Sequence, residues 1–76
     1  MQPYKFNGCN ATFGENQPEY LPLPAEVRGD AVTTCWRLSA EEIERVCDYG
    51  EIWITIKTFG QPLQPLLVTA ERPEDV

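Results

Sequence analysis

The chain has 76 residues and a formal net charge of -6 at pH 7, with six basic residues against twelve acidic ones. This length leaves room for one hydrophobic core, and so few Lys and Arg residues argue against a surface for long nucleic acids. A domain this small buries only about 60% of its unfolded surface, so its stability as a monomer is marginal and we expect a homo-oligomer.

The residue types that carry most protein chemistry are scarce. The sequence has no histidine, and its cysteines are an odd, widely spaced set without a Cys-x-x-Cys pair: Cys9, Cys35 and Cys47. Histidine is the commonest general base, and zinc sites are usually built from Cys and His. We therefore expect no catalytic residues, no metal and no cofactor, so the chain is not expected to be an enzyme.

The cysteine pattern and hydropathy also bear on location. An odd number of unrelated cysteines is typical of free thiols in a reducing compartment. No apolar run reaches the roughly 20 residues that cross a bilayer, and residues 1–5 lack the apolar centre of a signal peptide. We expect a protein that remains soluble in the compartment where it is made, without membrane contact.

Turn residues divide the first half of the chain. Residues 4–6 alternate in polarity before Asn7-Gly8, which predicts a short strand ending in a turn. Residues 9–24 carry several prolines and glycines, which favours an ordered irregular segment. Arg28-Gly29-Asp30 predicts a turn, followed by a strand at residues 31–37 in which Trp36 is expected to point inward.

A capped helix gives the sharpest local signal. Ser39 and Glu42 have the spacing of a capping box, in which each side chain accepts a hydrogen bond from the other residue's backbone N–H. Gly50 supplies the left-handed residue that ends many helices, which predicts a helix over residues 40–49. Its apolar stripe, expected to be buried, consists of Ile43, Val46 and Cys47.

The last third predicts two further strands. Residues 51–58 place three isoleucines on one face, expected to be core, and Trp53 on the opposite face, towards a partner, a ligand or a second layer. Residues 59–65 contain two prolines and predict a loop, and residues 66–69 predict a short strand that pairs back. We expect residues 71–76 to be a flexible charged tail that follows a single domain at residues 1–70. The expected fold is α+β, a mostly antiparallel sheet packed on one capped helix.

Two groups of side chains could form a ligand site. Arg37 and Ser39 flank the helix start, where backbone N–H groups attract anions, although the glutamates of the first turn compete for the same place. Aromatic rings can stack on a planar base and amides can read its edges, unless the rings are core or oligomer interface. The ligand-binding residues predicted on this basis are Trp36, Arg37, Ser39, Phe59, Gln61 and Gln64.

Three motifs carry a family resemblance. They are Leu21-Pro-Leu-Pro24, Thr34-Cys-Trp-Arg-Leu-Ser-Ala-Glu-Glu42 and Phe59-Gly-Gln-Pro-Leu-Gln-Pro65. In these motifs the chain resembles small accessory proteins encoded by tailed bacteriophages and prophages. The likeness covers most of residues 4–69 and implies a context, the cytoplasm of an infected bacterial host. It brings no site residues.

The resemblance implies a counter-defence protein that acts by stoichiometric binding. The first hypothesis is sequestration of a small nucleotide immune signal, without cleavage, in a site built by oligomer contacts. The alternative is a protein–protein inhibitor or structural accessory protein that covers a host protein, through the Trp53 face or the acidic helix. Mutation of Trp36 and Arg37 would impair the first function, and mutation of Trp53, Glu44 and Asp48 the second.

Overall fold

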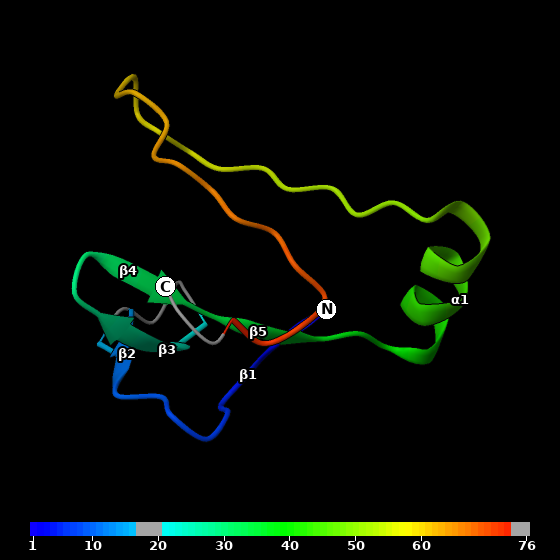
Figure 1. Cartoon of the computed structure of the whole chain (residues 1–76), viewed down its shortest axis with the longest axis horizontal. Helices are drawn as coiled ribbons and strands as arrows, with labels where there is room; N and C mark the ends of the chain where they lie inside the picture. The colour runs from blue at the N-terminus through cyan, green and yellow to red at the C-terminus, as the bar shows by residue number, and fades with distance from the viewer. Residues whose placement is uncertain (17–20, 74–76) are drawn as a thin grey trace.

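The structure, a computed structural model, describes residues 1–16 and 21–73. Its elements in chain order are β1 (Gln2–Tyr4), β2 (Ala11–Phe13), β3 (Leu23–Arg28), β4 (Ala31–Thr33), β5 (Cys35–Arg37) and α1 (Ala40–Tyr49). The strands form two antiparallel sheets, one of order β2-β3-β4 and one that pairs β1 with β5 (Figure 1). The chain is therefore a small α+β domain with mostly antiparallel strands and one helix, as expected.

The hairpin of β3 and β4 forms because the chain carries the right turn residues between them. Arg28 pairs with Ala31 and Val27 with Val32, which leaves Gly29 and Asp30 as a two-residue turn. Gly29 has a φ of 61°, a left-handed conformation that two-residue hairpin turns require. The predicted turn at residues 28–30 is confirmed.

The predicted strand at residues 31–37 is interrupted at Thr34. β4 pairs with β3, whereas β5 pairs with β1 in the register Gln2 with Arg37 and Tyr4 with Cys35. The chain thus changes sheet at Thr34, whose hydroxyl accepts a hydrogen bond of 3.0 Å from the Trp36 indole. The same pairing places the first strand at Gln2–Tyr4 rather than at residues 4–6.

The segment predicted to be irregular contains regular structure at both ends. β2 lies within residues 9–24, and β3 begins there, with Thr12 opposite Pro24 and Phe13 opposite Leu23. Pro24 cannot donate to a ladder, yet its carbonyl remains available to the neighbouring strand. Residues 17–20 of this segment lie outside the described residues.

The helix is capped as predicted. The Ser39 hydroxyl accepts from the Glu42 backbone N–H at 3.2 Å, and the Glu42 carboxylate accepts from the Ser39 N–H at 2.9 Å. Gly50, with φ 64°, ends the helix and donates its N–H to the Val46 carbonyl at 2.7 Å. The helix bounds 40–49 are confirmed.

The prediction that the apolar stripe of the helix is buried is wrong. The helix has no buried residue, and Ile43 is 52% exposed. α1 lies beyond the end of β5 rather than across a sheet face (Figure 1), and the N-terminal ammonium of Met1 donates to Glu42 at 2.8 Å. The first residue of the chain thus contacts α1 at the helix start.

The two strands predicted after the helix are not formed. Residues 51–69 make an extended arm, with a first limb at residues 51–57, a turn at 58–61 and a second limb at 62–69 (Figure 1). The predicted isoleucine core is absent: Ile52, Ile54 and Ile56 are 51%, 52% and 44% exposed. A strand needs a hydrogen-bonded neighbour, and the sequence pattern did not reveal that the first limb has none in the part of the chain that the structure describes.

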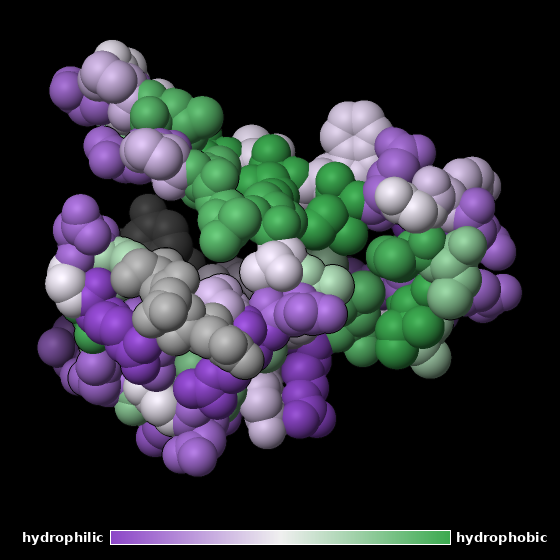
Figure 2. Space-filling view, in the orientation of Figure 1, coloured by the Kyte–Doolittle hydropathy of each residue, from purple (hydrophilic) through white to green (hydrophobic). Residues whose placement is uncertain are grey.

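Little of the described chain is fully buried. Ala25 is the one buried hydrophobic residue among residues 1–16 and 21–73. The accessible surface is 7005 Å², whereas a compact monomer of this mass exposes about 4,700 Å². The radius of gyration is 13.8 Å against about 11.4 Å for a compact chain. Figure 2 shows apolar residues along the arm that are open to solvent.

Candidate functional site

The six predicted ligand-binding residues fall into two groups in a single chain. Trp36, Arg37 and Ser39 lie at the junction of β5 and α1, whereas Phe59, Gln61 and Gln64 lie at or near the tip of the arm. Figure 1 shows the arm tip well away from this junction. The structure therefore does not bring the two groups to one place within one chain.

Arg37 is held by an aromatic ring. Its guanidinium carbon lies 3.7 Å from the centroid of the Tyr4 ring, because Tyr4 is diagonal to Arg37 in the β1–β5 register. No ion pair joins Arg37 to a carboxylate in the described part of the chain. Stacking on a ring fixes a guanidinium plane while its N–H edges remain able to bind an anion.

Trp36 points to the opposite side of β5. Successive side chains of a strand alternate between faces, so Trp36 and Arg37 cannot approach one small ligand from the same face of β5. Trp36 is 43% exposed instead of pointing into a core, and its indole N–H is already used by Thr34.

Glu42 occupies the anion position at the helix start. Its carboxylate accepts hydrogen bonds from the Ser39 backbone N–H at 2.9 Å and from the Met1 ammonium at 2.8 Å. The hydrogen bond with the N-terminal ammonium, followed by the bond from the Ser39 backbone, holds the pKa of Glu42 below its usual range. An ionised carboxylate already fills this position, so Ser39 acts here as a helix cap.

The arm tip holds an aromatic ring in an uncommon backbone conformation. Phe59 and Gly60 have φ values of 54° and 82°, and Gln61 donates its N–H to the Thr58 carbonyl at 3.0 Å. Two successive positive φ values define a type I′ turn, which favours Asn-Gly over a bulky first residue. The Phe59 ring is 87% exposed, so packing within the chain does not account for phenylalanine at this position.

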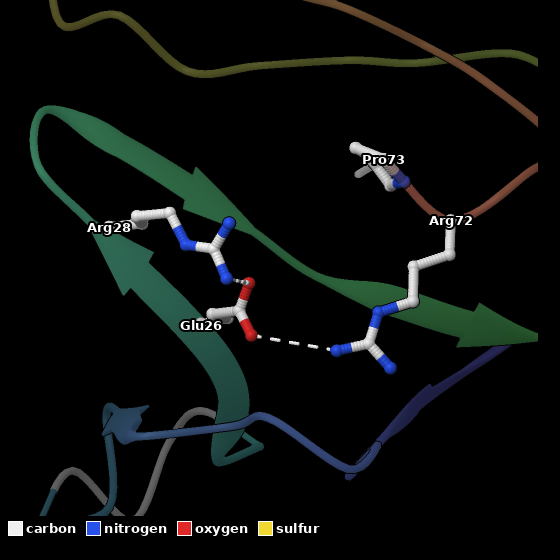
Figure 3. A pocket seen from close by; sticks show the side chains of 4 residues that line it. All are labelled: Glu26, Arg28, Arg72 and Pro73. Atoms are coloured by element: carbon white, nitrogen blue, oxygen red, sulfur yellow. Dashed lines mark ion pairs between the residues drawn. The ribbon is translucent and has the colours of Figure 1, made fainter. Parts of the chain in front are cut away.

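The sequence did not reveal a cavity of about 350 Å³ lined by Glu26, Arg28, Arg72 and Pro73. Figure 3 shows the Glu26 carboxylate between two guanidinium groups, each 3.6 Å away. Glu26 is the better protected partner, with a side chain that is 14% exposed against 57% for both arginines. Arg72 belongs to the segment predicted to be a flexible tail, and no sequence signal linked it to β3; residues 74–76 lie outside the described part.

Gly8 makes room for this ion-pair cluster. Gly8 has a φ of 121°, and a Cβ atom built on it would overlap the Glu26 carboxylate and lie 2.6 Å from an Arg72 nitrogen. The Arg72 guanidinium also lies 5.2 Å from the Phe6 ring centroid. The cluster thus connects residues near both ends of the chain to the central strand β3.

Other site types have little support in the described residues. Residues 1–16 and 21–73 contain no group of three or more Cys, Asp or Glu side chains placed to hold a metal ion. Within the same residues, no helix has the length and apolarity of a membrane span. The three cysteines are unpaired, and Cys35 and Cys47 are exposed.

No model of a known protein family matches the chain, and no characterised protein or solved structure matches it either.

Proposed function

We propose that the chain is a non-catalytic binding protein that contacts a protein partner through the Trp53 face of its arm. The observation that carries the proposal is Trp53, whose side chain is 88% exposed in the middle of an extended limb. Tryptophan is enriched among the residues that dominate binding energy at protein interfaces. A large ring that contributes nothing to its own fold is well placed for such a contact.

The neighbouring residues suit an interface. Trp53 shares its face with Thr55 and Lys57, so the ring is surrounded by polar side chains, as the anchors of interfaces often are. Given the resemblance to phage proteins, the partner is a protein of the bacterial host and the place of action is the host cytoplasm. The protein acts there as a stoichiometric inhibitor or structural accessory protein.

The test compares the two tryptophans. A partner captured by the wild-type chain from bacterial lysate is purified, and its affinity and stoichiometry are measured by calorimetry with wild type, Trp53→Ala and the matched control Trp36→Ala. A residue that anchors an interface contributes at least about 2 kcal/mol, so Trp53→Ala should weaken binding roughly 30-fold. An equal affinity of wild type and Trp53→Ala for the purified partner would refute the proposal.

A second candidate function is sequestration of a small nucleotide immune signal. It is favoured by Phe59, because a bulky residue at positive φ is costly and such outliers cluster at ligand sites. Gln61 and Gln64 are close in sequence on the arm and could hydrogen-bond a base stacked on the Phe59 ring. The predicted contribution of Arg37 requires the arm tip of another copy.

This candidate is tested by thermal unfolding with a panel of mononucleotides and cyclic oligonucleotides. A ligand at 100 times its Kd stabilises the fold by about 2.7 kcal/mol, roughly 10–20 °C for a domain of this size. Phe59→Asn removes the ring but suits the turn, so this variant should unfold normally and lose the shift. A flat panel with the wild-type chain would eliminate the candidate.

A further inference from the structure

The backbone of the first limb has no partner among residues 1–16 and 21–73. Residues 51–57 make no backbone hydrogen bond to any described residue; the nearest such bonds are Gly50 to Val46 and Gln61 to Thr58. An extended run of unpaired N–H and C=O groups is a template for pairing with another strand. The first limb also contains no proline or glycine, so every residue in it can join a ladder.

The second limb is a poor partner for the first. Pro62 and Pro65 have no N–H to donate, and Figure 1 shows the two limbs diverging after the turn. The turn geometry at Phe59 and Gly60 would suit a hairpin, yet the limbs do not form one. No described segment pairs with the first limb, which favours a partner strand from another chain.

The first limb is complementary to itself. When two copies run antiparallel with Ile54 opposite Ile54, Glu51 of each copy stands opposite Lys57 of the other, and Ile52 stands opposite Ile56. The two charged residues of the first limb are thereby neutralised as two symmetric ion pairs. The isoleucines form one continuous apolar face across the pair of strands.

The chain exposes more surface than a compact monomer does. The accessible surface exceeds that of a compact monomer by about 2,300 Å², which lies within the range of roughly 1,000–2,500 Å² that each partner buries in an obligate dimer. A second copy paired along the first limb covers part of this exposed surface and is available wherever the chain is made.

We propose that two copies of the chain form a two-fold symmetric dimer in which residues 51–57 pair antiparallel about Ile54. The Trp53 face points away from the isoleucine face, so the dimer presents two copies of it side by side. The dimer is therefore compatible with the proposed contact between Trp53 and a host protein, but does not depend on it.

The first test is a charge exchange, followed by sedimentation of the purified chain without any other component. Glu51→Lys and Lys57→Glu each replace the two symmetric ion pairs by two pairs of like charges. Each variant should therefore weaken dimerisation about tenfold or more. The double variant restores both pairs and should dimerise almost as tightly as wild type. Glu44→Lys on α1 makes the same change of charge outside the limb and should leave the dimer intact.

The second test is a cysteine cross-link across the axis, made in a Cys9→Ser, Cys35→Ser, Cys47→Ser background; none of the replaced cysteines is buried. Directly opposed residues have Cα atoms about 4.5–5.5 Å apart, within the disulfide range. Ile54→Cys should oxidise to a covalent dimer. Ile52→Cys should not form this disulfide, because the two copies of residue 52 lie four positions apart along the paired strands.

Three outcomes would overturn the dimer: a monomeric wild-type chain, a double charge variant no better than the single ones, or equal cross-linking at positions 52 and 54. None of them bears on the contact at Trp53, which is measured with a different component. Failure of the dimer and failure of the proposed function are thus distinguishable.

Discussion

The side chain of Asn10 substitutes for backbone at the edge of the β2-β3-β4 sheet. Its amide donates to the Val27 carbonyl at 2.9 Å, and its carbonyl accepts from the Val27 N–H at 2.7 Å. The Asn10 backbone N–H also donates to the Ala25 carbonyl at 2.9 Å. One side chain thus extends the β2–β3 ladder by two hydrogen bonds beyond Ala11.

Asn10→Ala removes both side-chain bonds and retains the backbone bond. Each hydrogen bond contributes a net of about 0.5–1.5 kcal/mol, and water can reach the groups left behind, so we expect a loss of about 1–2 kcal/mol. For a domain of this size that lowers the melting temperature by roughly 5–15 °C at fixed protein concentration. Differential scanning calorimetry measures the shift, with Asn16→Ala, an exposed asparagine after β2, as the control.

Asn10→Asp distinguishes the two bonds. An ionised carboxyl still accepts from Val27 but turns an oxygen towards the Val27 carbonyl, so at pH 7 this variant should be at least as unstable as Asn10→Ala. Its deficit should shrink as the pH falls below about 4, because a protonated carboxyl can donate. Two results would contradict the stabilising role of the two Asn10 hydrogen bonds. One is an Asn10→Ala variant that melts within about 2 °C of the Asn16→Ala control, and the other is an Asn10→Asp variant whose stability does not change with pH.

Three further predictions concern the caps and turns. Ser39→Ala removes the helix cap and should cost about 1 kcal/mol in urea unfolding, with Ser39→Thr close to wild type. The pKa of Glu42 is lowered in the folded state, chiefly by the N-terminal ammonium. The ionised Glu42 therefore stabilises the fold fully above about pH 4.3, and this stabilisation disappears as the pH falls through the lower folded pKa. Glu42→Gln should flatten that part of the stability–pH curve. A Cβ at Gly50 meets nothing within 4 Å, whereas one at Gly8 overlaps the ion-pair cluster, so Gly8→Ala should lower the melting temperature more than Gly50→Ala.

The parts of the fold that depend on local interactions were predicted well. The helix bounds were predicted from Ser39, Glu42 and Gly50 because a capping box and a left-handed stop are formed within a few residues. The turn at Gly29 was predicted for the same reason. Such features need no knowledge of what lies elsewhere in the chain.

The errors arose where pairing partners decide the structure. The isoleucine alternation in residues 51–57 predicted a strand, and the structure shows an extended segment without pairing, because periodicity does not say whether a partner strand lies beside it. Thr34 looks like the middle of a strand, and only the change of partner from β3 to β1 explains the break there.

The candidate site shows the same limit. Trp36, Arg37 and Ser39 were expected together and are together because they are neighbours in sequence, and the same holds for Phe59, Gln61 and Gln64. The distance between the two groups depends on where the arm points, which no local pattern specifies. The cluster of Glu26 with Arg72 was missed because its members are far apart in the chain and each resembles an ordinary surface charge.

The position of Arg72 has a consequence for the order of folding. A protein is synthesised from its N-terminus, so Glu26 and Arg28 can meet early, whereas Arg72 reaches Glu26 only after the helix and the arm have been made. Until then, the stretch that follows α1 is anchored at one end alone. We therefore expect the sheets and the helix to form first, and the arm to take its place only after Arg72 has been made.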